Sequence, residues 1–129
     1  MSLDVAPDLL EQARNGEVGE AAFVGTVRTS LPYAYNLIGS LAAALGASTA
    51  EFADNQVPPP SEAERGQLLR VLASDSIRGS LERHFGIRLA FQNCHRVAAF
   101  RPGDPGPSYQ EFISPRAQLL NQSPALRNC

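Results

Sequence analysis

Residues 31–45 of this 129-residue chain read LPYAYNLIGSLAAAL and contain no charged side chain. Their apolar residues recur every three or four positions, which predicts a helix. A helix that is apolar around so much of its girth is buried on several sides. The stretch therefore predicts either a central core helix or half of a dimer interface. Its main face comprises Leu31, Ala34, Tyr35, Ile38, Leu41, Ala42 and Leu45, and Tyr33, Leu37 and Ala44 widen it.

The uncharged run is longer than this helix, since it extends from Thr29 to Ala50, and that length raises the question of a membrane span. A span needs about 20 continuous, predominantly apolar residues. This run is interrupted by Pro32, Asn36, three serines and two glycines. We therefore expect a buried helix with no membrane partner.

The remaining chain is patterned mostly as helix. A Ser-x-x-Glu capping box at Ser61 and Glu64 follows three prolines and predicts a helix start. That helix changes the phase of its apolar residues at 74–76, which predicts a bend or two helices, and Gly86 ends it. Pro32 kinks the chain or restarts the helix, with Ser30 as a possible N-cap of the new segment and Gly46 as a possible stop. Further helices are expected over residues 8–14, from about 17 to 31, and over 116–122 after Ser114-Pro115.

Residues 87–100 form the one segment with a strand-like pattern. Residues 87–92 alternate between polar and apolar side chains, and residues 96–100 are compatible with a returning strand. A hairpin turning at 93–95 is the preferred interpretation, and a helix is the alternative. Residues 52–60 and 102–107 are expected to be irregular connections. The predicted fold is mainly α, a single helical domain over residues 1–129 with a possible short β-hairpin near 87–100.

The composition limits the partners that this chain can have. Hydrophobic residues make up 43% of the chain, which is typical of a globular protein, and the net charge is −2. All eleven basic residues are arginines, which a GC-rich genome explains. No concentrated positive field is evident, so we expect no nucleic-acid partner. The chain opens without a signal peptide, which favours a cytoplasmic location with Cys94 and Cys129 reduced.

No cofactor or metal motif is present in the sequence. His84, His95, Cys94 and Cys129 do not have the spacing of zinc ligands. A phosphate-binding loop, a nucleophile elbow and a dinucleotide fingerprint are all missing. We therefore expect no metal and no cofactor.

Two groups of polar residues could carry a function. Asp75, Arg78 and Glu82 share one helix face, either as a solvated salt-bridge face or with a carboxylate as general base. His84 points away from that face and is expected to meet the last carbonyls of its helix. Tyr33 and Tyr35 are unusual in so apolar a helix, because buried hydroxyls need partners.

The tyrosines of the apolar helix, together with Asn36, either form hydrogen bonds inside the core or line a pocket. In the pocket interpretation, Phe91 and Asn93 of the hairpin face the same cavity, which suits a small peptide. His95 is then the candidate catalytic residue, as a proton relay. The candidate substrate-binding residues are Tyr33, Tyr35, Asn36, Phe91 and Asn93.

The run SLPYAYNLI at residues 30–38, followed by a capped Leu-rich helix, resembles the small proteins of cinnamycin- and duramycin-type lanthipeptide clusters, which form the lysinoalanine bridge. The resemblance covers residues 17–86, and no catalytic residue of that family aligns with this chain. It implies a role in antibiotic biosynthesis, in which a lysine amine of a bound, dehydrated peptide adds to a dehydroalanine without a cofactor.

The resemblance thus implies a peptide-tailoring protein, a candidate cross-linking enzyme, that acts on a lanthipeptide substrate. The alternative is a non-enzymatic helical homodimer that binds a protein or a small molecule. In both cases we expect a homodimer with the helix of residues 31–45 at or beside the interface, because a small domain has difficulty enclosing a helix that is apolar on so many sides.

Overall fold

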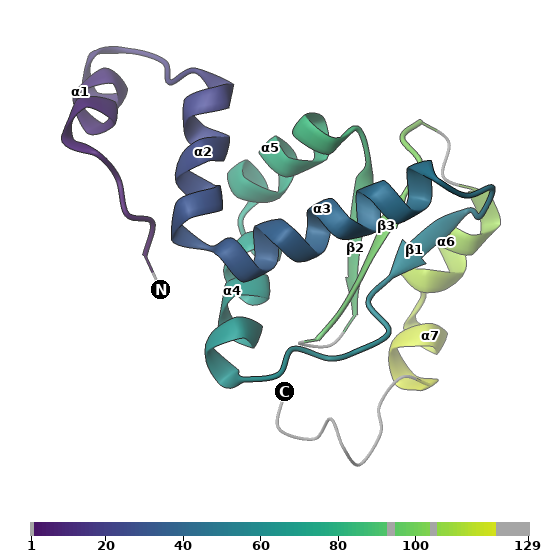
Figure 1. The fold of residues 1–129 in the computed structure, drawn as a ribbon. Helices are drawn as coiled ribbons and strands as arrows, with labels where there is room; N and C mark the ends of the chain where they lie inside the picture. The colour runs from purple at the N-terminus through teal and green to yellow at the C-terminus, as the bar shows by residue number, and fades with distance from the viewer. Residues whose placement is uncertain (1, 93–94, 104–105, 121–129) are drawn as a thin grey trace.

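The computed structural model describes residues 2–92, 95–103 and 106–120 (Figure 1). Helices predominate, as the sequence predicted, and a small three-stranded antiparallel sheet that contains the predicted hairpin packs among them. In chain order the elements are α1 (Pro7–Asn15), α2 (Glu20–Ser30), α3 (Pro32–Gly46), β1 (Phe52–Asp54), α4 (Glu62–Leu72), α5 (Asp75–Phe85), β2 (Arg88–Gln92), β3 (Arg96–Phe100), α6 (Gly106–Phe112) and α7 (Pro115–Leu120).

The sheet has the order β1-β3-β2, and both pairs of neighbouring strands are antiparallel. The hairpin preferred for residues 87–100 is therefore confirmed, and the helical alternative is wrong. β2 and β3 pair from Arg88 opposite Phe100 to Gln92 opposite Arg96. β3 is the central strand, so β1 and β2 each have one edge that pairs with no other strand of the described residues.

Helices cover both faces of the sheet. On one face, Leu89, Val97 and Ala99 pack into the main core with α2, α3, α4 and α5. On the other face, Ala90, Ala98 and Phe100 pack against Phe112 of α6, together with the partly buried Phe52 and Tyr109. The alternation of side chains along a strand explains this division. The two faces of β2 therefore belong to two different clusters.

Helix α3 is the central core helix that the sequence predicted (Figure 1). Its residues Ala34, Ile38, Leu41 and Leu45 are buried, and it contacts α2, α4, β1 and β3. Its opposite side, with Asn36, Ser40 and Ala43, is exposed. One copy of the chain therefore encloses the apolar face of α3 by itself. The dimer was expected because a small domain has difficulty enclosing such a helix, and the structure removes that reason. The homodimer itself stays a prediction.

The helix boundaries follow the capping signals closely at α4 and α5. The Ser61 hydroxyl accepts the amide of Glu64 at 3.2 Å and donates to its carboxylate at 3.1 Å. The predicted phase change is a break between two helices, where the Ser74 hydroxyl accepts the Ile77 amide at 3.3 Å. Gly86 ends α5 with φ at 66°, a left-handed conformation that glycine adopts without strain.

Four local predictions need correction. Residues 52–60 are not wholly irregular, because 52–54 form β1, and α6 begins inside the predicted loop of 102–107. Ser30 does not cap α3, since its hydroxyl accepts the Asp4 amide at 2.8 Å instead. Gly46 is the last residue of α3 and does not lie beyond its end.

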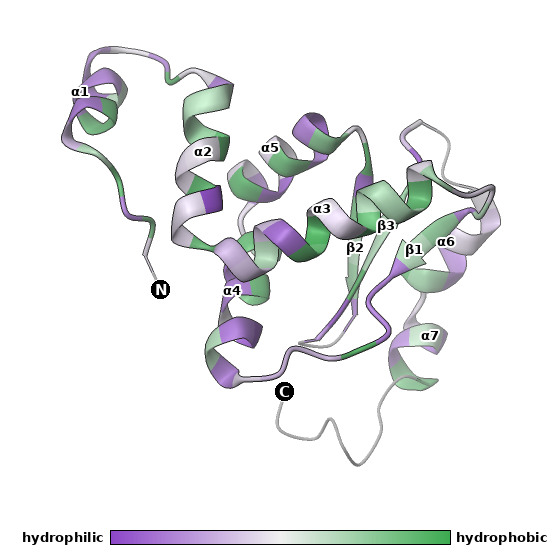
Figure 2. Ribbon diagram, viewed as in Figure 1, coloured by the Kyte–Doolittle hydropathy of each residue, from purple (hydrophilic) through white to green (hydrophobic). Residues whose placement is uncertain are grey.

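Helix α1 lies apart from the sheet and its covering helices, and none of its residues is buried (Figure 1). Figure 2 shows its hydrophobic and hydrophilic residues on separate sides, and its Leu10 is 43% exposed. Among the described residues, no helix is long and apolar enough to cross a membrane.

Candidate functional site

The candidate site is a hollow of about 300 Å³ that runs over the free edge of β2. Its walls come from the end of α4, from α5, from β2 itself and from α6 on the far side of the sheet. Polar atoms make up much of its lining, and arginines lie on both sides of the strand. The lining residues are Leu72, Arg78, Glu82, Arg88, Leu89, Ala90, Phe91 and Tyr109.

The pairing register shows which backbone groups of β2 face this hollow. In an antiparallel pair, residues alternate between those that bond to the partner strand and those whose N–H and C=O point away from it. The Leu89 amide bonds to a side chain of α5, so it points away from β3. Phe91 follows Leu89 by two residues and has the same orientation. The outward groups are therefore the N–H and C=O of Leu89 and of Phe91.

One of these four groups already has a partner. The Glu82 carboxylate accepts the Leu89 amide at 2.8 Å, because the turn at Gly86 places the end of α5 beside the start of β2. The described residues supply no partner for the Leu89 C=O or for the Phe91 N–H and C=O. The edge thus offers an acceptor at Leu89 and a donor at Phe91 side by side.

The two arginines of the hollow differ in what they contact. Arg78 donates to the Asp75 carboxylate at 2.6 Å and to the Leu72 C=O at 2.9 Å, so its guanidinium holds the α4–α5 break together. Arg88 is exposed and lies over the ring of Tyr109, with its Cζ 4.5 Å from the ring centroid. Within the described part of the chain no carboxylate pairs with Arg88, which leaves its charge available to a ligand.

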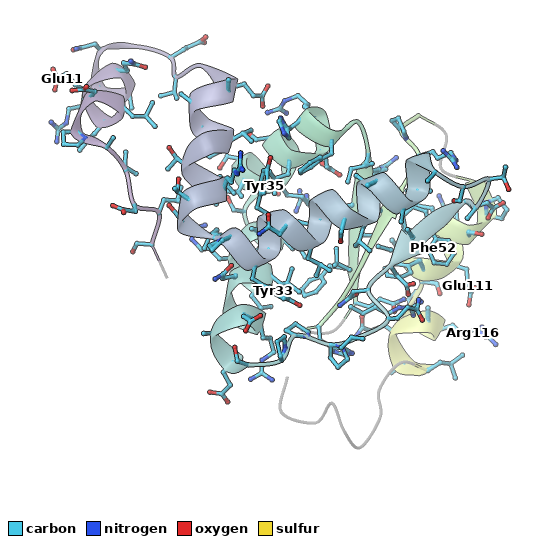
Figure 3. All side chains as sticks on the ribbon, in the orientation of Figure 1. Glu11, Tyr33, Tyr35, Phe52, Glu111 and Arg116 are labelled. Carbon is cyan, nitrogen blue, oxygen red and sulfur yellow. The ribbon has the colours of Figure 1, made fainter. Side chains whose placement is uncertain are left out.

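The aromatic residues predicted as a binding patch on α3 point in different directions (Figure 3). The Tyr35 hydroxyl lies 3.2 Å from Nε2 of His84, and its ring packs on Phe85 of α5. Tyr33 lies toward α4, where burial and then the charge of Glu64 raise the pKa of its hydroxyl. Asn36 is exposed. The structure thus does not bring the α3 residues together.

The other predicted site residues belong to the hairpin. Phe91 lines the hollow at β2, and Asn93 lies outside the described residues. His95 precedes β3, and its backbone C=O accepts the Asn55 side chain at 2.6 Å. Burial, and then the charges of Arg96 and Arg65, lower the pKa of the His95 imidazole. The role of His95 as a proton relay stays a prediction.

Sequence reasoning missed three of the residues that define the hollow, namely Glu82 as a partner of the strand edge, Arg88 and Tyr109. Glu82 was grouped with Asp75 and Arg78, and the Asp75–Arg78 ion pair does form at 2.6 Å. His84 contacts Tyr35, whereas the sequence suggested the last helix carbonyls. An arginine at the start of an expected edge strand was a signal that could have been used.

Metal-ligating side chains do not gather in the part of the chain that the structure describes, where no group of three or more His, Cys, Asp or Glu residues could hold an ion. Cys94 and Cys129 lie outside that part. Its buried side-chain polar atoms all have hydrogen-bond partners, so no orphaned group marks a ligand site.

A family model identifies the relationship that the sequence analysis missed. The model KH_NucS_shadow, described as NucS shadow ORF, matches residues 1–129. No curated protein and no solved structure matches the chain. The match contradicts the resemblance to the cinnamycin- and duramycin-type proteins, and with it the assignment to lanthipeptide biosynthesis and lysinoalanine formation. Because the match spans the whole sequence, the chain belongs to the NucS shadow ORF family.

Proposed function

We propose that this chain is a non-enzymatic binding protein that accepts an extended peptide segment along the free edge of β2. The observation that carries the proposal is the pair of outward groups in the hollow, the Leu89 C=O and the Phe91 N–H. Strand addition to an open sheet edge is a common mode of peptide recognition, in which main-chain hydrogen bonds supply affinity.

The occupied Leu89 amide limits the ways in which an incoming strand can pair with β2. In a parallel pair, one ligand residue donates its N–H to the C=O of one residue and accepts the N–H of the residue two positions later. The Leu89 C=O and Phe91 N–H fit that pattern, with the ligand residue opposite Ala90. An antiparallel strand centred on Leu89 needs the Leu89 N–H, which Glu82 holds. An antiparallel strand centred on Phe91 would find both groups of that residue open, so the Leu89 contact excludes one antiparallel register only. We propose the parallel pairing because it uses the open groups of both residues in the hollow.

Nucleic acid is a less suitable ligand for this chain than a peptide. The letters KH also name a nucleic-acid-binding domain that clamps the backbone with a Gly-x-x-Gly loop. The connection between α4 and α5 reads Ala73-Ser74, so it contains no Gly-x-x-Gly sequence. Gly16 to Gly19 has the right spacing, but the adjoining hollow is lined by Asp8, Glu11 and Glu17, which repel phosphates.

The family description concerns a reading frame and names no activity. Several levels of this sequence agree on one fold: the capping box at Ser61, the left-handed Gly86 and the hairpin register all support the same packing. Such agreement is typical of sequences that specify a structure. A cytoplasmic location stays a proposal. Mass spectrometry of trypsin-digested cell extracts tests whether the protein is expressed, since trypsin cleaves this lysine-free chain after arginine only.

Binding is tested with a neutral, end-blocked peptide, acetyl-Thr-Val-Gln-Val-Thr-amide, by NMR titration of the ¹⁵N-labelled full chain. We expect the Phe91 amide to shift most. The Phe91→Pro variant removes the donor and should abolish binding. Its control, Phe91→Ala, loses the same ring but keeps the N–H and should still bind. If the wild type does not bind the peptide, or if Phe91→Ala loses binding as fully as Phe91→Pro does, the proposal is refuted. Preferential binding of an octauridylate or octaadenylate replaces it with nucleic-acid recognition.

The homodimer is a separate proposal. We propose that two copies contact each other through the exposed side of α3, which includes Ser40 and Ala43. Ala43→Arg places a charge on that row without entering the core. Light scattering should then show a dimer for the wild type and a monomer for the variant, whereas an equal mass for both excludes an interface on α3.

A further inference from the structure

We infer that the peptide bound at β2 carries an acidic side chain, which Arg88 reads while Tyr109 holds the guanidinium in place. This inference rests on the proposed strand pairing and adds the chemical class of the partner. It starts from the contact between Arg88 and Tyr109, because these residues come from different elements and meet at the rim of the same hollow.

The register places a ligand side chain next to Arg88. A ligand residue opposite Ala90 points to the same face of the sheet as Ala90 does, and Arg88 lies two positions earlier on that face. Ala90 is small and 8% exposed, so it leaves room for a larger neighbour on the adjacent strand. That neighbour lies about 4.8 Å away across the pair, within reach of an arginine two residues along.

The charge of this position is positive. Arg78 and Glu82 both have partners on the helix side of the strand, namely Asp75 and the Leu89 amide. On the α6 side Arg88 stacks on the ring of Tyr109, and no carboxylate of the described residues pairs with it. Stacking on a ring leaves the N–H groups of the guanidinium edge free to bind a carboxylate. A ligand glutamate or aspartate therefore matches the site, and a lysine is repelled.

Tyr109 acts here as a positioning residue. It belongs to α6, whose packing against Phe100 fixes the ring, with the two ring centroids 5.2 Å apart at 76°. An arginine held over a fixed ring loses fewer conformations when it binds a carboxylate. Replacing Tyr109 should therefore reduce the preference for acid while the backbone pairing of the peptide is unchanged.

The test uses three end-blocked peptides, acetyl-Thr-Val-X-Val-Thr-amide with X as Glu, Gln or Lys, and fluorescence anisotropy with a label on a C-terminal linker. For the wild type we expect the Glu peptide to bind about three- to ten-fold more tightly than the Lys peptide, a difference that salt reduces. Arg88→Glu should reverse the order. The matched control, Arg14→Glu on α1, changes the net charge equally and should leave the order intact.

The outcomes separate the two proposals. Equal binding of the three peptides overturns the inference of an acidic partner and leaves strand pairing standing. Failure of all three peptides to bind a folded wild-type chain overturns both. A preference for Glu that Arg88→Glu does not change also overturns the inference, because another cation then reads the acid. With Tyr109→Leu, we expect the Gln peptide to bind as before and the Glu peptide to lose two- to five-fold.

Discussion

The contact between Glu82 and the Leu89 amide is the feature of the site that a single substitution tests most directly. Glu82→Ala removes the carboxylate that accepts this amide at 2.8 Å. A hydrogen bond to a charged group contributes roughly 1.5–3 kcal/mol, but Glu82 is partly exposed and water can reach the vacated amide. We therefore expect the free energy of unfolding to fall by about 1–2 kcal/mol in urea titrations.

Hydrogen exchange reports on the same bond at one atom. A local loss of about 1.4 kcal/mol corresponds to about ten-fold faster exchange of the Leu89 amide. Glu82→Gln is the matched control, because its amide oxygen still accepts and only the charge is lost; it should retain most of the protection. Unchanged exchange of the Leu89 amide in Glu82→Ala would refute the assignment of this amide to the outward edge of β2, and the predicted direction of the ligand strand with it.

Three further predictions concern stability. Gly25→Ala should stabilise the chain by about 0.5–1 kcal/mol in urea titrations, since a Cβ added there meets nothing within 4 Å. Gly39→Ala should destabilise it, because a Cβ added there would lie 3.2 Å from the Phe85 ring. Equal effects of the two substitutions would contradict this packing. Arg101→Ala should lower the free energy of unfolding by about 1 kcal/mol, because its guanidinium donates to the carbonyl of Leu45 in α3 and to those of Ser48 and Ala50 just beyond the helix; calorimetry that finds no loss would discount those bonds. The lowered pKa of His95 favours its neutral form, so the stability that this side chain contributes is present above its ordinary pKa of about 6.5 and is lost as the pH falls. The His95→Gln variant should therefore lose less free energy of unfolding than the wild type between about pH 7.5 and about pH 5.5. An equal loss would assign the acid sensitivity to other groups.

The sequence predicts the elements whose signals are local. The apolar periodicity of residues 31–45 identifies the core helix, and Ser61 and Gly86 mark a helix start and a helix end close to where the structure has them. The alternation over 87–92 identifies a strand of the hairpin. Each of these features depends on residues within one or two turns of chain, so no tertiary contact is needed to recognise them.

Elements that depend on distant partners escape such reasoning. β1 is three residues long, and it forms because Phe52 to Asp54 pair with β3, more than forty positions away in the chain. The Asn55 side chain extends this pairing by accepting the Val97 amide at 2.9 Å and donating to the His95 C=O at 2.6 Å. Neither contact leaves a periodic trace in residues 52–60, which the sequence presents as an irregular connection.

The site escapes prediction for a similar reason. Local sequence patterns place Glu82 on a salt-bridge face, because Arg78 precedes it by four residues and Asp75 by seven. The left-handed turn at Gly86 instead brings Glu82 back over the first residues of β2, where it accepts a backbone amide. One carboxylate thereby closes part of an edge that would otherwise invite pairing with other chains. The part left open, between the Leu89 C=O and the Phe91 N–H, is where we propose that a peptide pairs, and Arg88 on Tyr109 lines the same hollow.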